Sequence, residues 1–379
     1  MGWVSFFNDF SSEMIYPIIP IFLTSVLGAP IIVVGLIEGI ADSASSFLKV
    51  ISGWLSDKLQ KRKIFIVFGY TLSAISKTIF TFAGTWQMVL TGRFLDRLGK
   101  GTRTSPRDAL ISESALKHQK GRAFGFHRAM DTLGAITGPL VAITLLKYFN
   151  DNYQLIFFLA AIPSFIGVIL LILFVKEKKK KTLIHQDRSS SWQSFGFPFK
   201  KFLLVSLVFS VGNSSDAFLI LRSQNLGLTV TMTIIAYTLF NLTYALLSTQ
   251  AGTTSDKIGH KKILLSGYLI FSLVYLLFGI IDSGIFLWFL FPAYGFYMAL
   301  TEGVSRAYMT HLVPKEEIAT AFGLQQTVTG LCSFISSLIA GLLWTHIGPQ
   351  APFIFGSIMA IIATFIFIIA EKSNETKSI

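Results

Sequence analysis

The sequence predicts an all-α membrane protein with twelve transmembrane helices in two halves of six, and three observations support this fold class. Of its residues, 52% are hydrophobic and only 14% are charged, whereas about a quarter of the residues in soluble proteins are charged. Apolar runs of about 20 residues, each long enough to cross about 30 Å of hydrocarbon, recur along the whole chain. Short motifs of the first half also return in the second half.

The expected spans are mainly apolar stretches separated by polar or charged loops. In chain order they cover residues 4–27, 31–55, 64–83, 87–110, 122–146, 154–175, 202–221, 229–251, 263–281, 286–310, 318–344 and 351–370. The 36 Phe residues suit helices that face lipid. The first apolar stretch is too long for a secretory signal peptide and carries two carboxylates, so no cleaved signal is expected.

The net charge of +12 is distributed in a way that indicates membrane topology rather than binding to nucleic acid. Nearly all loop Lys and Arg residues follow even-numbered spans, as in the run Lys58–Lys63. The loops after odd-numbered spans hold only Lys147 and Arg222. By the positive-inside rule, we expect both termini in the cytoplasm and the protein in a plasma (inner) membrane. We expect the protein to be a monomer. Its expected partners are membrane lipid and a small solute, and we expect it to bind no nucleic acid.

The chain repeats itself. Residues 53–63 read GWLSDKLQKRK and residues 252–262 read GTTSDKIGHKK. The tripeptide Ala-Phe-Gly occurs at 123–125 and, at nearly the same offset, at 321–323. We therefore predict an N-terminal six-helix bundle over residues 1–175 and a C-terminal six-helix bundle with a short cytoplasmic tail over 202–379, joined by a polar cytoplasmic linker, 176–201. Transporters with parallel repeats place their solute site between the halves, near the bilayer midplane.

Three motifs resemble the major facilitator superfamily. The loop at 53–63 resembles its signature Gly-x-Leu-x-Asp-Arg-x-Gly-Arg-Arg, although Gln60 occupies a Gly position that Gly259 keeps in the second copy. The stretch RFLDRLGKG at 93–101 resembles the family's helix-4 pattern, with charges at three positions that are neutral there. The stretch GAITGP at 134–139 resembles a helix-5 element often found in antiporters.

This resemblance implies a twelve-helix alternating-access transporter and does not identify its solute. It also implies a cytoplasmic gate made by the loop motifs and the inner end of the fourth span. The residues expected in the gate are Gly53, Asp57, Lys61, Arg62, Arg107, Gly252, Asp256 and Lys261. Gly134, Gly138 and Pro139 are expected at a close helix contact, because small residues let two helices approach each other.

The fourth span carries an unusual concentration of charge for a membrane helix. Its basic and hydroxyl side chains recur at intervals of three and four residues and so form one stripe: Arg93, Arg97, Lys100, Thr104 and Arg107. A charge at the bilayer centre costs about 2.5–3.5 kcal/mol, so we expect this stripe to face water or other helices rather than lipid. Pro106 is expected to kink or end the helix.

The other charges of the spans are candidates for contact with the solute or for proton coupling. The full candidate set is Asp9, Glu13, Glu38, Asp42, Arg93, Asp96, Arg97, Lys100, Arg128, Asp131, Asp216, Glu302 and Arg306. Permanent ion pairing between the first-half carboxylates and cations is the structural alternative, and the sequence leaves both interpretations open. Because the second half contributes only three of these residues, we expect proton-linked chemistry mainly in the first half.

The function expected from these features is secondary active transport of a small solute by alternating access. Protonation of a buried carboxylate changes its pairing and so the relative free energies of two conformations, which makes a proton gradient the expected energy source. We expect no cofactor, no catalytic residue and no metal site. The positive stripe favours an anionic, polycarboxylate or metal-chelate solute, and efflux of cationic or amphipathic drugs is the alternative. A lipid enzyme and a non-transporting sensor are the alternatives from other classes.

Overall fold

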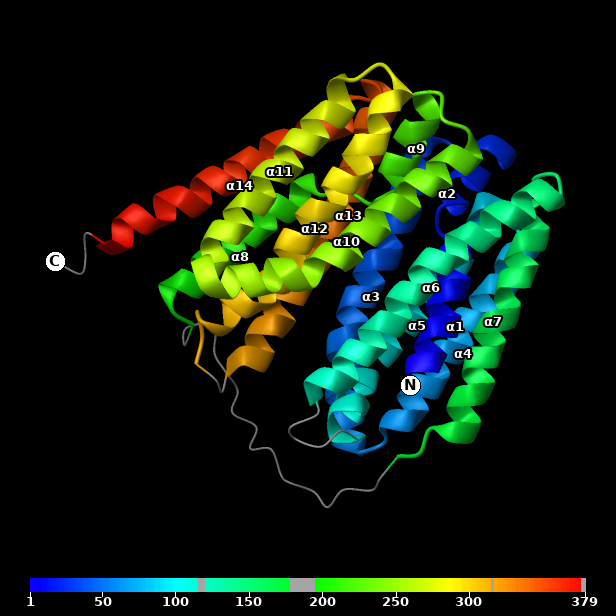
Figure 1. Cartoon of the computed structure of the whole chain (residues 1–379), viewed down its shortest axis with the longest axis horizontal. Coiled ribbons are helices and arrows are strands. Elements are labelled where there is room, and N and C mark those ends of the chain that lie inside the picture. The colour runs from blue at the N-terminus through cyan, green and yellow to red at the C-terminus, as the bar shows by residue number, and fades with distance from the viewer. Residues whose placement is uncertain (115–119, 178–194, 315–316, 376–379) are drawn as a thin grey trace. The chain divides into compact units, whose positions relative to one another are not determined.

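The computed structural model describes residues 1–114, 120–177, 195–314 and 317–375, and all regular secondary structure in these ranges is helical (Figure 1). Contacts between Cα atoms divide the chain into two compact units. The first unit contains Met1–Thr182 and Leu228–Thr238, and the second contains Leu183–Gly227 and Leu239–Ile379. Most of the expected linker 176–201 lies outside the described residues, and a helix already begins within it at Phe197.

The helices of the first unit begin with an interrupted segment. Its pieces are α1 (Gly2–Ile15), the short α2 (Ile19–Ile21) and a π-helical turn, η1 (Phe22–Val26). Pro17 and Pro20 cannot donate backbone hydrogen bonds, which explains why one regular helix does not cover the expected span 4–27. The other helices are α3 (Ile31–Leu59), α4 (Arg62–Thr81), α5 (Trp86–Ser114), α6 (Lys120–Tyr148) and α7 (Tyr153–Phe174).

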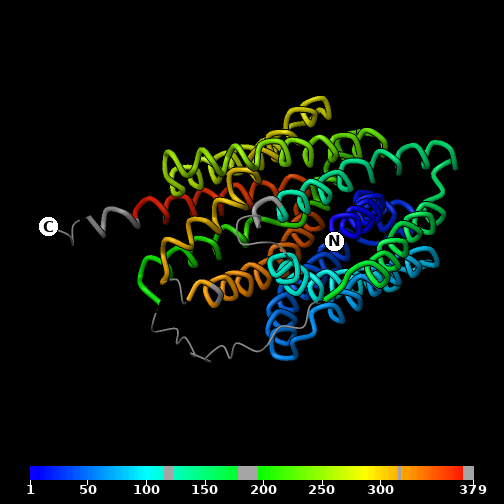
Figure 2. The backbone as a smooth tube through the Cα atoms, turned by 60° about the horizontal axis from the view of Figure 1, so that its bottom comes forward, coloured from blue at the N-terminus to red at the C-terminus, as the bar shows by residue number. Residues whose placement is uncertain are grey.

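The α5 helix continues through Pro106 to Ser114, so of the two expected outcomes Pro106 does not end the helix, whereas a kink there stays a prediction. In this unit α5 packs against α3 and α4, and α1 packs against α6 and α7. Figure 2 shows the dark blue α1 beside the green α7. Glycines allow these contacts to be close. A Cβ on Gly69 of α4 would lie 2.6 Å from the carbonyl oxygen of Gly99, and one on Gly101 would lie 2.6 Å from that of Ser45 in α3.

The second unit, like the first, begins with an interrupted segment that longer helices follow. It contains α8 (Phe197–Gly212), α9 (Ala217–Asn225), α10 (Val230–Ile258, whose first residues belong to the first unit), α11 (His260–Ile280), the 3₁₀ turn η4 (Gly284–Phe286), α12 (Leu287–Thr310), α13 (Ile318–His346) and α14 (Ala351–Glu375). The expected seventh span is broken between α8 and α9, at the polar residues 213–216. Local hydrogen bonds from Asn, Ser and Asp side chains compete with the helix, which explains a break at this place.

The contacts within the second unit repeat those within the first. There α11 packs against α12 and α14, and α8 packs against α13 and α14. In the first unit α4 packs in the same way against α5 and α7, and α1 against α6 and α7. These four contacts follow the same pattern in both units, and the division into two six-helix bundles stays a prediction.

Within the described residues, 10 helical segments are long and apolar enough to cross a membrane. The two expected spans outside this set are the interrupted segment from α1 to η1 and the charged helix α5. The packing of α5 explains how a helix with so many charges is accommodated in the bundle. The α5 helix packs between two apolar helices, and its buried charges contact protein groups described below.

Candidate functional site

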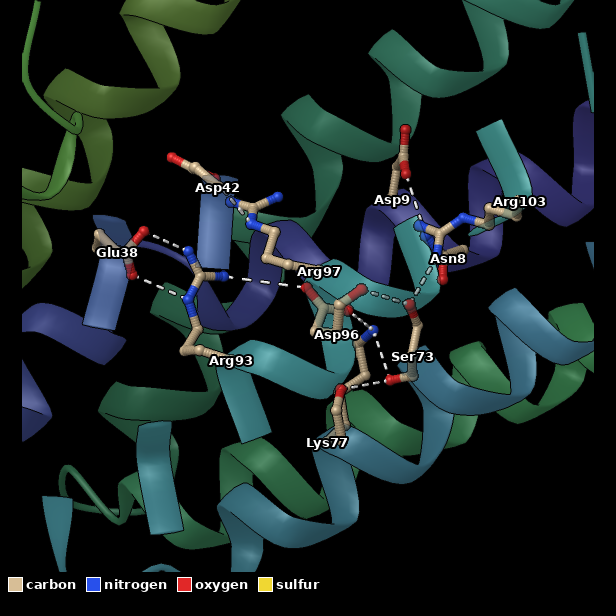
Figure 3. Close-up of polar contacts among 11 residues, drawn as sticks. Asn8, Asp9, Glu38, Asp42, Ser73, Lys77, Arg93, Asp96, Arg97 and Arg103 are labelled. Carbon is tan, nitrogen blue, oxygen red and sulfur yellow. Dashed lines mark hydrogen bonds and ion pairs between the residues drawn. The ribbon is translucent and has the colours of Figure 1, made fainter. Parts of the chain in front are cut away.

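A chain of buried charges joins α3, α5 and α4 in the first unit (Figure 3). Arg93 forms a two-pronged ion pair with Glu38, with its Nε and Nη2 atoms 2.9 and 2.5 Å from the two carboxylate oxygens. Its Nη1 atom lies 3.9 Å from Asp96. Asp96 in turn lies 3.6 Å from the Nζ atom of Lys77. Because planar carboxylate and guanidinium groups match in this geometry, the Arg93–Glu38 pair fixes both rotamers.

The same chain continues toward the other end of α4 through Ser73. Lys77 donates to the carbonyl oxygen of Ser73 at 3.1 Å, and Arg103 donates to the Ser73 hydroxyl at 2.5 Å. The guanidinium of Arg103 also lies 4.5 Å from the ring centre of Tyr70. Lys77, Arg93, Asp96 and Arg103 are all at least nine-tenths buried. Buried charges are tolerated when they are paired and hydrogen-bonded, so these four residues have a structural explanation.

A second ion pair lies beside the first, between the same two helices. The Nε atom of Arg97 lies 3.2 Å from the Oδ1 atom of Asp42, one helical turn beyond the Arg93–Glu38 pair on both α3 and α5. The ring of Tyr16 lies 5.1 Å from the guanidinium carbon of Arg93 and 5.8 Å from that of Arg97. Such cation–π contacts add to the stabilisation of these guanidinium groups.

Lys100 differs from the arginines on α5. It is exposed, and no carboxylate among the described residues lies within ion-pair distance of it. Arg97 and Arg103 repel its charge, whereas Asp9 and Glu13 on α1 attract it. Neither of these half-buried carboxylates forms an ion pair with a base in the described part of the chain. Asp9 accepts a hydrogen bond from Asn8 at 3.2 Å, and Glu13 accepts one at 3.3 Å from Tyr237, in the part of α10 that belongs to this unit.

Asp131 on α6 adds a third carboxylate near this group and interacts electrostatically with Asp9. The His127 ring lies 3.4 Å from Asp131, whereas Arg128 on the same helix is exposed. The close approach of α6 to α1 depends on two glycines. A Cβ on Gly134 would lie 2.7 Å from the carbonyl oxygen of Phe6, and one on Gly138 would clash with that of Phe10. Pro139 lies within α6 without ending it.

The loop motif of the first unit forms a network with two acidic residues that the sequence analysis did not single out. Arg62 lies 2.9 Å from both Asp57 and Glu113. The Glu177 carboxylate accepts hydrogen bonds from the backbone N–H groups of Arg62 and Lys63, at 2.5 and 3.1 Å, and so caps the first turn of α4.

The other expected gate residues of this unit are Lys61, Arg107 and Gly53, and the contacts described below lie outside the Arg62 network. Lys61 is exposed. Arg107 pairs with the neighbouring Asp108 at 2.9 Å and lies 3.5 Å from the Ser5 hydroxyl. A Cβ on Gly53 would lie 3.2 Å from Ser105, which indicates a close approach of α3 to α5.

In the second unit, the break between α8 and α9 contacts a group of buried tyrosines. Tyr294 donates a hydrogen bond to Asp216 at 2.8 Å, and Asn213 donates to the Tyr297 hydroxyl at 3.2 Å. Tyr275 is fully buried next to Tyr294, with ring centres 6.1 Å apart. Aromatic side chains thus surround the one carboxylate at this break, and this cluster was not recognised in the sequence.

Among the remaining candidates of this unit, Glu302, Arg306 and Asp256 are exposed, and Gly252 and Lys261 are partly buried. Glu302 accepts a hydrogen bond from Tyr244 and lies 3.7 Å from Arg306 one turn later. Asp256 lies 3.8 Å from His260, and the Lys261 ammonium lies 5.3 Å from the ring centre of Phe367. A Cβ on Gly252 would meet no atom within 4 Å, in contrast to Gly53 in the first copy of the motif.

Arg222, which the sequence analysis counted only as a loop charge, is 1% exposed. It donates to the carbonyl oxygens of Phe278 and Ile281 at 3.0 and 2.9 Å, and to the Asn225 side chain at 2.5 Å. The carbonyls at the end of α11 have no partners within the helix, and Arg222 satisfies them. No local signal in the sequence indicates this contact, because the two segments are far apart along the chain.

Comparison of the sequence with protein-family models identifies the family of this chain. The Major Facilitator Superfamily model matches residues 1–222 and 202–378. The chain belongs to the major facilitator superfamily. It is 40% identical over 369 residues to the MFS-type transporter MJ1317 of Methanocaldococcus jannaschii, covering 96% of this chain and 92% of that protein. It is 23% identical over 392 residues to the quinolone resistance protein NorA of Staphylococcus aureus, covering 99% and 97%.

Solved structures of the major facilitator superfamily have the same fold. A variant of the nucleoside transporter NupG matches with a TM-score of 0.80 at 14% identity, over 97% of this chain and 98% of the other. The D-xylose–proton symporter matches with a TM-score of 0.77 at 13% identity, over 97% and 95%. The protein is therefore a multi-pass membrane protein and a secondary transporter of this superfamily, which is not a family of enzymes. The fold class and the family expected from the sequence are confirmed.

Proposed function

We propose that this transporter couples proton movement to the export of a solute that carries a positively charged group. The observation that supports this proposal is the unequal pairing of charges in the first unit. Arg93 and Arg97 each form an ion pair with a carboxylate of α3, whereas Asp9, Glu13 and Lys100 form none with the described residues. Among the candidates on α1, α3 and α5, two carboxylates of α1 and one ammonium of α5 therefore support contact with a solute or proton exchange.

This pairing removes the reason for favouring an anionic solute. That preference rested on a net positive stripe on α5, and two of its bases are neutralised by Glu38 and Asp42. Asp9, Glu13 and Lys100 together carry more negative than positive charge when ionised, and this charge attracts a cation. The similarity to a protein named for quinolone resistance agrees with export. A carboxylate that takes up a proton when the solute leaves would link the two movements.

The test is transport by purified protein in proteoliposomes with an imposed pH gradient. An amphipathic organic cation and a tricarboxylate anion serve as alternative solutes, and the variants Glu13→Gln and Lys100→Gln are compared with the wild type. We expect cation transport driven by the gradient, lost in Glu13→Gln and retained in Lys100→Gln. The exposed loop variant Asp151→Asn is the matched control for the loss of one carboxylate.

Two results would contradict the proposal. If the anion is transported and Lys100→Gln alone abolishes its transport, Lys100 binds an anionic solute and the charge assignment is reversed. If cation transport by the wild type does not respond to the pH gradient, proton coupling is excluded although the cation preference stands. The two parts of the proposal therefore fail separately.

A further inference from the structure

Two histidines meet where three helix ends of the second unit come together. His260 is the first residue of α11, and His311 follows the last residue of α12. Their Nε2 atoms are 3.1 Å apart, and their rings are stacked with centres 5.0 Å apart and planes inclined by 27°. The Oδ1 atom of Asp256, near the end of α10, lies 3.8 Å from His260 Nε2. None of these contacts contributes to the transport function proposed above.

The hydrogen bonds around His260 favour a proton on its Nδ1 atom. The Ser255 hydroxyl donates its proton to the carbonyl oxygen of Gly252 at 2.7 Å. Its oxygen is therefore an acceptor for His260 Nδ1, 3.0 Å away. A neutral imidazole with its proton on Nδ1 presents a lone pair on Nε2. That lone pair faces His311, and the other ring nitrogen is held by an oxygen, as in histidines that bind metals.

The separation of the two nitrogens suits a common metal ion. Two imidazole nitrogens about 2.0–2.1 Å from one tetrahedral Zn²⁺ are about 3.3 Å apart, close to the 3.1 Å between His260 and His311. Among the residues that the structure describes, no three His, Cys, Asp or Glu side chains gather in a metal-binding arrangement. The pair thus offers two ligands, water completes the coordination, and the nearby Asp256 carboxylate contributes charge.

We propose that His260 and His311 form a two-histidine clamp for a divalent transition-metal ion of the Zn²⁺ or Ni²⁺ type, which imidazole ligands favour. A bound ion fastens the end of α12 to the corner between α10 and α11. This corner contains Asp256, one of the residues expected in the cytoplasmic gate. Metal binding at the clamp therefore restrains these helix ends and slows any transport step that requires them to separate.

The test measures metal binding by the full-length protein in detergent. The melting temperature is recorded with increasing ZnCl₂, and with MgCl₂ as the control for an oxygen-seeking ion. We expect Zn²⁺ to raise the melting temperature of the wild type, because a ligand that binds only the folded state stabilises it. His311→Ala is expected to abolish this rise. His311 is exposed, so its replacement is compatible with folding.

Two further variants distinguish specific metal binding at His260 and His311 from non-specific binding at other histidines. Ser255→Ala removes the acceptor that orients His260 and is expected to weaken Zn²⁺ binding about 10-fold or more. His346→Ala replaces an exposed histidine elsewhere in the unit and is expected to bind Zn²⁺ like the wild type. The proposal is overturned if Zn²⁺ does not raise the melting temperature of the wild type, or if His311→Ala responds as the wild type does. Neither result depends on the solute or on proton coupling.

Discussion

Arg93 lies in the first third of α5, and only 3% of it is exposed. Its charge is tolerated because Glu38 presents both carboxylate oxygens to it, and Asp96 and the Tyr16 ring lie on its other sides. Taking two charges out of water costs several kcal/mol per ion, so this pair does not by itself guarantee stability. Removal of one partner, however, leaves a buried charge without compensation.

Arg93→Met is therefore expected to lower the free energy of unfolding by about 3–5 kcal/mol. The double variant Arg93→Met with Glu38→Met is expected to recover most of this loss, because neither member of the pair then remains as an unpaired buried charge. Denaturant titration in detergent measures both values. The control is Arg306→Met, which breaks a pair whose side chains are 61% and 43% exposed and is expected to cost less than about 1 kcal/mol. Equal losses for Arg93→Met and Arg306→Met would contradict the structural role of Arg93.

Helix ends at the two copies of the loop motif differ in backbone conformation. Gln60 follows α3 with a φ of 53° and a ψ of 32°, the left-handed region that glycine adopts most easily. Its side chain donates to the carbonyl oxygen of Asp57 at 2.8 Å, which offsets part of the strain. Gly259 has a φ of 100° and a ψ of 130°, which other residues rarely adopt. The second copy of the motif thus requires glycine more strictly than the first.

Gly259→Ala is expected to destabilise the protein by about 1–3 kcal/mol, because the new Cβ forces a strained backbone. Gly252→Ala is the matched control from the same motif. It lies within α10 with open space around it, and alanine there is expected to be neutral or to stabilise by about 0.5–1 kcal/mol. Thermal unfolding in detergent distinguishes the two variants. A Gly259→Ala protein as stable as Gly252→Ala would show that the turn relaxes without strain.

At the scale of the whole molecule, the distribution of Lys and Arg predicts the orientation in the membrane. The runs that follow even-numbered spans are expected on the cytoplasmic side together with both termini. Lys147, in the last turn of α6, is expected on the opposite side. The native Cys332 is buried, so single cysteines introduced at exposed positions give a low-background readout.

Labelling of intact cells with a membrane-impermeant maleimide tests this orientation. Lys147→Cys is expected to react from outside, whereas Lys58→Cys is expected to react only after the membrane is permeabilised. The wild type controls for reaction at Cys332. Labelling of Lys58→Cys in intact cells would reverse the predicted topology and place the loop motif of the first unit outside.

The sequence predicted most of the fold because membrane crossing imposes strong local constraints. An apolar stretch of sufficient length must be helical in lipid, since every backbone polar group needs a partner within its own segment. The break at Pro17 and Pro20 and the continuation of α5 through Pro106 were not predicted. A proline lacks its backbone N–H in both places, so this local property alone does not tell a break from a continuous helix.

By itself, the sequence determined the number of helices and the superfamily, and it predicted an internal repeat and a gathering of charges inside the first half. Only the tertiary structure decided which charges neutralise each other. Spacing along α5 places Arg93, Arg97 and Lys100 on one stripe, yet Arg93 pairs with Glu38 and Arg97 with Asp42, whereas Lys100 forms no ion pair with the described residues. Helix periodicity determines which residues share a face, whereas ion pairing depends on the rotation and axial position of the neighbouring helix, which side-chain packing between helices sets.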